Sequence, residues 1–177
     1  MRARIAALLL AFLMQAASVA VSAAAAEVRP ANIEIAVHLL FDRSAPSLAQ
    51  KDGEEVRQFV VSVESRPNPG VSGQSQLIVT TRHKDIADSV PFGQESRRSR
   101  WDIVGKNRLR GTLKWAKNAT FVLGVTIGSD YRTCTASFAV ALLKGETDYV
   151  TTRPNGEEQK FSNFRVVNTV CRIEPMP

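Results

Sequence analysis

Side chains with catalytic chemistry are scarce in this sequence. Its 177 residues include two histidines and two cysteines, and no serine lies in the G-x-S-x-G turn of an esterase-type hydrolase. A phosphate-binding glycine loop and a dinucleotide fingerprint are also absent. His83, Asp85 and Asp88 form a local group of metal-ligand residue types, but no second cluster completes a coordination shell. We therefore expect no cofactor, no metal site and no identifiable catalytic residue, and we interpret this group as part of a solvated loop.

After residue 26 the sequence lacks any apolar run long enough to span a membrane. The segment before it has two arginines, the apolar stretch "IAALLLAFLMQAA" and Ala-x-Ala sites in "VSAAAAE", which together are typical of a signal peptide. A membrane anchor is the alternative, but the second half of the segment is mostly Ala and Ser. We interpret residues 1–26 as a signal peptide and residues 27–177 as a single all-β domain. This predicts bacterial export to the periplasm or the medium, with no transmembrane segment left after cleavage.

Helical periodicity is nearly absent, whereas apolar side chains alternate with period two through most of the chain. The alternation and the turn residues between its segments predict an antiparallel β-sandwich or flattened barrel of eight or nine strands. Two stretches do not fit the pattern. "PSLAQKDGEEV" (46–56) is compatible with one helical turn, and "HKDIADSVPFGQES" (83–96) is interpreted as a long loop.

The two cysteines, Cys134 and Cys171, are predicted to form one disulfide, because an even pair behind a signal peptide indicates an oxidising compartment. Two arrangements bring them within bonding distance. The favoured one pairs Thr133–Leu143 antiparallel with Ser162–Arg172 and leaves residues 144–161 as a hairpin that turns at Asn155-Gly156. The other is a bridge between two packed sheets.

Positive charge is concentrated in one segment. Without Arg2 and Arg4 the formal net charge falls from +6 to +4, whereas residues 82–117 alone hold ten Lys and Arg against four acids. Alternation about a turn at "VGKN" predicts that both tryptophans, Trp101 and Trp115, face inward and that five cations share the opposite, exposed face. These cations are Arg98, Arg100, Arg108, Arg110 and Lys114.

Two interpretations fit these five cations. They are either an anion-binding surface, in which arginine offers bidentate contacts, or a solvated strand face that keeps the domain from aggregating. We expect an exported, non-catalytic binding module that recognises an anionic envelope polymer or a protein partner. Nucleic acid is not expected, because the protein is exported and the tryptophans lie opposite the cations. The alternative is a small glycan-acting hydrolase whose carboxylates lie far apart in the sequence, with Glu54, Glu55, Glu157 and Glu158 as candidates.

Overall fold

The computed structural model describes residues 28–45, 48–83 and 86–177. The predicted signal peptide and Asp85 lie outside the described residues. The described chain is all-β, and no helix in it could cross a membrane. Its strands are β1 (Ala31–Ala45), β2 (Leu48–Pro67), β3 (Ser75–His83), β4 (Ile86–Pro91), β5 (Ser99–Ile103), β6 (Arg108–Leu113), β7 (Ala119–Ile127), β8 (Cys134–Leu142), β9 (Tyr149–Thr152) and β10 (Glu158–Pro175).

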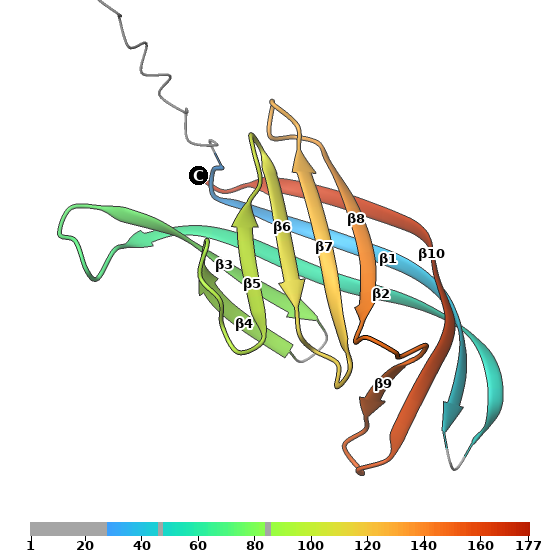
Figure 1. Cartoon of the computed structure of the whole chain (residues 1–177). Coiled ribbons are helices and arrows are strands. Elements are labelled where there is room, and N and C mark those ends of the chain that lie inside the picture. Colours follow the sequence, from blue (N-terminus) through green and yellow to red (C-terminus); the bar gives the residue numbers. More distant parts are fainter. Residues whose placement is uncertain (1–27, 46–47, 84–85) are drawn as a thin grey trace, which may run out of the picture.

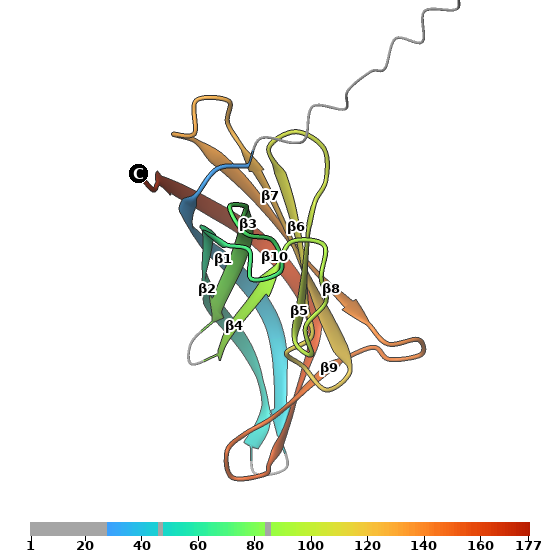
Figure 2. The ribbon, with the colours of Figure 1, turned by 90° about the vertical axis from the view of Figure 1, so that its left-hand side faces the viewer.

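The strands form two antiparallel sheets, which confirms the predicted sandwich. Six strands pair in the order β4-β3-β2-β1-β10-β9, and four pair in the order β5-β6-β7-β8. In Figure 1 the smaller sheet lies in front and crosses the larger one obliquely, and Figure 2 shows the two layers side on. The far ends of β1, β2 and β10 continue past the end of the smaller sheet, together with β9 (Figure 1).

The core follows from the alternation seen in the sequence. Inward positions of both sheets are apolar, so their side chains meet between the layers. Each large aliphatic or aromatic side chain buried there contributes about 1.5–3 kcal/mol. Trp101 of β5 is 0% exposed and lies across Gly111, its partner on β6. A Cβ atom at position 111 would lie 2.6 Å from the indole ring, so glycine is what allows the tryptophan to pack there.

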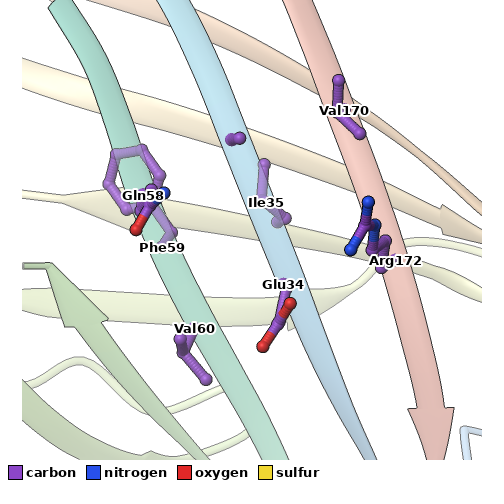
Figure 3. Close-up of a pocket in the computed structure, with 8 residues that line it drawn as sticks. Glu34, Ile35, Gln58, Phe59, Val60, Val170 and Arg172 are labelled. Atoms are coloured by element: carbon purple, nitrogen blue, oxygen red, sulfur yellow. The ribbon is translucent and has the colours of Figure 1, made fainter.

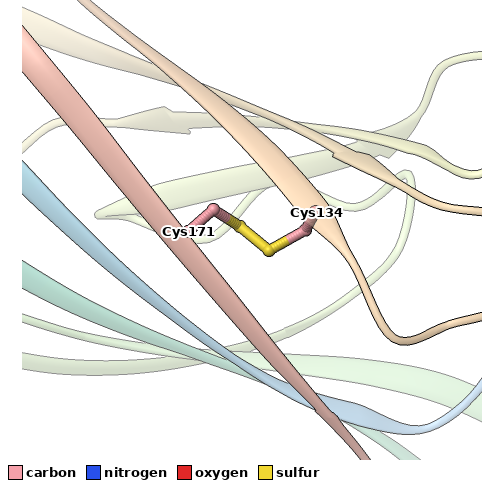
Figure 4. Close-up of a disulfide and its surroundings, with 2 residues drawn as sticks. All are labelled: Cys134 and Cys171. Atoms are coloured by element: carbon pink, nitrogen blue, oxygen red, sulfur yellow. A yellow bond between two sulfur atoms is a disulfide. The ribbon is translucent and has the colours of Figure 1, made fainter.

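The predicted disulfide between Cys134 and Cys171 is confirmed (Figure 4), with Cα atoms 5.6 Å apart. The favoured pairing of Thr133–Leu143 with Ser162–Arg172 is wrong. β10 pairs instead with β1, where Cys171 is opposite Ile35, and β8 pairs with β7, where Cys134 is opposite Ile127. Both cysteines therefore face the interior from different sheets, and the bridge joins the layers. The predicted turn at Asn155-Gly156 does connect β9 and β10, with Arg153 N–H donating to the Glu157 carbonyl (2.9 Å).

Two other local predictions are wrong. The segment interpreted as a long loop contains β4, which pairs with β3 from Ile78↔Pro91 to His83↔Ile86. Residues 46–47 of the segment compatible with a helical turn lie outside the described residues, and its described part, from Leu48 on, belongs to β2. The described chain therefore has ten strands, one more than the upper predicted number.

Candidate anion-binding face

The five predicted anion-binding residues lie on the outer face of the smaller sheet. The turn between β5 and β6 closes with Val104 N–H donating to the Arg108 carbonyl (2.8 Å). Gly105 and Asn107 there adopt positive φ angles of 74° and 56°, a backbone geometry suited to glycine and asparagine. Because side chains alternate along a strand, this register fixes which residues point outward.

All five cationic side chains are exposed, and the hairpin register brings them together. Arg110 is opposite Asp102 across β5 and β6. Beyond the strand ends, Lys114 N–H donates to the Arg98 carbonyl (2.6 Å), which extends the ladder by one pair. We call the surface formed by Arg98, Arg100, Arg108, Arg110 and Lys114 the basic face.

Two of these cations are already paired with acids. Arg100 contacts Asp102, with 3.0 Å between Nε and Oδ2, and Lys114 contacts Glu95. The hydrogen bond and the charge of Lys114 lower the pKa of Glu95, so this carboxyl stays ionised at neutral pH. The remaining three, Arg98, Arg108 and Arg110, make no ion pair with any residue that the structure describes. They supply the charge that is available to a ligand.

A shallow hollow of about 360 Å³ adjoins the basic face. It forms because Gly124 of β7 has no side chain and lies between Arg110 of β6 and Ser137 of β8. In the neighbouring row, Arg108 of β6 is opposite Thr126 of β7, which in turn is opposite Thr135 of β8. The rest of the hollow's lining is aliphatic or small, with the hydroxyl group of Ser137, and none of its described lining residues is acidic. The face therefore offers guanidinium groups beside a flat floor that an extended chain can follow.

Both tryptophans face away from the basic face, but they are buried to different extents. Trp101 is fully buried, whereas Trp115 lies beyond the end of β6 and is only partly buried. The ring of Trp115 stacks on Phe59 and His83, with centroids 6.0 Å and 5.7 Å away. The interpretation of His83 as part of a solvated loop is wrong, because this β3 residue is 7% exposed and packs in the aromatic cluster. Among the described residues no three potential metal ligands gather at one point.

The carboxylates named as hydrolase candidates are each beside a basic side chain. Glu54 contacts His38, Glu55 lies 3.5 Å from Arg57, Glu157 lies 3.5 Å from Arg153, and Glu158 contacts Lys117. The hydrogen bond and charge of Lys117 lower the pKa of Glu158. A glycosidase needs two carboxyl groups facing each other across a cleft. Of the four candidates, Glu55 lines a cleft.

That cleft was not anticipated from the sequence. It lies at the end of the sandwich where the larger sheet extends past the smaller one, and its volume is about 530 Å³. We call it the end cleft. Its lining includes the arginines Arg43, Arg57 and Arg153, the carboxylate of Glu55, the amide of Gln159 and the aromatic rings of His83, Trp115, Phe121 and Phe161. A signal was present in β2, where the alternation inverts: Arg57 is buried and its neighbour Val56 is 54% exposed.

The larger sheet carries a different surface on its outer side. A groove of about 330 Å³ runs over β2, β1 and β10 there (Figure 3). Val60 and Val170 are exposed beside it, and Glu34 is opposite Arg172. The charges beside this groove are of both signs, so it is not a surface of uniform positive charge.

Comparisons of the chain with known protein families, with curated proteins and with solved structures find no match.

Proposed function

We propose that this protein is an exported binding module that holds an anionic polymer of the cell envelope against its basic face. The observation that carries the proposal is the position of Arg98, Arg108 and Arg110, which are exposed and without an ion-pair partner among the described residues. Arg108 and Arg110 border a hollow whose described lining contains no acid. Arginine can grip a sulfate, phosphate or carboxylate group with two parallel hydrogen bonds.

The shape of the surface also supports a polymer as the ligand. The hollow is open and shallow, so a small molecule would stay largely hydrated in it, whereas an extended chain can contact several cations at once. Contacts of this kind release counterions from the polymer, which makes binding steeply dependent on salt. No chemical step is needed for such a role.

The test is retention on immobilised heparin and on immobilised lipopolysaccharide. Wild-type protein is compared with Arg108→Ala/Arg110→Ala, and the control is Arg165→Ala/Arg172→Ala. The control also removes two arginine charges, but from exposed positions of β10. We expect the first variant to elute at clearly lower salt than both other proteins. If all three elute together, the basic face does not bind polyanions and serves only to keep a strand surface solvated.

A further inference from the structure

The end cleft contains an unusual set of polar side chains for the inner side of a β-sandwich. Inward positions elsewhere on β1 and β2 hold Ile, Val, Leu and Phe, but the same rows continue with Arg43 on β1 and with Glu55 and Arg57 on β2. Arg57 is 7% exposed, and Gln159 on β10 is equally buried. Charged groups are seldom buried to this extent unless they have partners.

The aromatic rings hold these guanidinium groups by their faces. The central carbon of Arg57 lies 5.5 Å from the ring centroid of Tyr149 and 5.6 Å from that of Phe121. That of Arg43 lies 5.3 Å from Phe41. A cation held through a ring face keeps its N–H groups, which lie in the guanidinium plane, available for an acceptor.

Several of the donors in the cleft lining have no acceptor. Arg57 donates to the Tyr149 hydroxyl and lies 3.5 Å from Glu55, which accounts for only part of its hydrogen-bonding capacity. The buried Nε atoms of Arg43 and Arg57, the Nε2 atom of Gln159 and the Nε1 atom of Trp115 have no hydrogen-bond partner among the described residues. An unmatched buried donor in a native structure requires an explanation, and a missing anionic ligand is one.

We propose that the end cleft binds a small organic anion, in which a carboxylate or phosphate group is attached to a flat apolar body. The oxyanion accepts hydrogen bonds from Arg43, Arg57 and Gln159. The apolar body lies against the rings of Trp115 and Phe121. The volume of about 530 Å³ is within the range of small-molecule sites. This site lies between the sheets, so it is separate from the basic face on the outside.

The probes are benzoate and phenyl phosphate, which share a flat body and differ in the oxyanion. Inorganic phosphate tests the oxyanion alone, and benzyl alcohol tests the apolar body alone. Binding is measured by isothermal titration calorimetry and by tryptophan emission, to which Trp115 contributes from the cleft while Trp101 is shielded in the core. We expect at least one aromatic anion to bind with a dissociation constant of about 1 mM or lower, and benzyl alcohol not to bind.

The variants are Arg57→Gln and Arg43→Gln, with Arg165→Gln as the control that removes an exposed charge elsewhere. Far-ultraviolet circular dichroism checks that each is folded, and Arg43→Gln serves if loss of the buried Arg57 prevents folding. Removing one charge-assisted contact should weaken binding about tenfold, while the control leaves it unchanged. The proposal is overturned if neither aromatic anion binds in the millimolar range, or if the cleft variants bind as tightly as the wild type.

Discussion

The disulfide between Cys134 and Cys171 gives the most direct prediction of stability. It connects two sheets that share no hydrogen-bonded strand pair in the described residues, so its removal leaves every ladder intact. The main loss is then the constraint on the unfolded chain. For a sequence separation of 37 residues, the chain-entropy model gives about 4 kcal/mol.

This free energy of unfolding can be measured by urea denaturation of Cys134→Ala/Cys171→Ala. With a slope of about 2 kcal/mol per molar urea, the midpoint should fall by about 2 M relative to the wild type. Reduction of the wild-type protein provides the matched control. It should lower the midpoint by a similar amount, because the cross-link and not the sulfur packing carries the effect, and reductant should leave the variant unchanged.

Two results would refute this reasoning. A midpoint within a few tenths molar of the wild type would mean that the bridge constrains little, for instance because the unfolded chain already holds these segments together. Two alkylatable thiols in the native protein, found by intact mass, would mean that the bridge does not form.

Two further predictions concern the core. Gly111→Ala should lower the free energy of unfolding by about 1–3 kcal/mol, because the new Cβ would overlap the Trp101 ring. Gly124→Ala should lower it by less, because the nearest atom there is the movable Ser137 hydroxyl. Equal losses for the two variants in urea denaturation would contradict this account of the packing. Burial raises the pKa of Tyr149 to about 12. The unfolded chain therefore releases this proton first, and stability should fall by about 2 kcal/mol as pH rises from 10 to 12. Tyrosinate absorbance at 295 nm that is complete by pH 10.5 would argue against this shift.

Period-two alternation was sufficient to predict the fold class, because one face of nearly every strand is buried. It failed for β4, where Asp88 occupies the same parity as Ile86 and Val90. This aspartate accepts a hydrogen bond from the Ser96 hydroxyl (2.9 Å), a partner eight residues away that makes a polar group acceptable beside the core. Alternation records side-chain polarity alone, so it does not reveal such compensation.

Strand partners were harder to predict than strands. The spacing of Cys134 and Cys171 allowed either a pair within one sheet or a bridge between sheets, and the local solution was favoured. The structure shows a bridge between the sheets, because β10 pairs with β1, the first strand of the described chain, over almost the full length of β1. A contact between the two ends of a chain has no local sequence signal.

The basic face could be predicted from the sequence, whereas the end cleft could not, because its residues come from distant strands. Residues of the basic face belong to one hairpin, so the sequence was enough to predict that they lie together and exposed. The end cleft gathers side chains from β1, β2, β3, β7, β9 and β10 and from the segments that precede β7 and follow β9. Its polar residues were visible in the sequence, notably where Arg57 interrupts the apolar row of β2, but their meeting point depends on how far the larger sheet extends past the smaller one.

The central claim, that the basic face binds polyanions, is tested most directly by the salt dependence of heparin affinity in solution. The logarithm of the affinity of the wild type should fall linearly with the logarithm of salt concentration. For Arg108→Ala/Arg110→Ala the slope should be shallower by on the order of 1.5, from two lost contacts, while Arg165→Ala/Arg172→Ala keeps the wild-type slope. Equal slopes for all three proteins would contradict the claim.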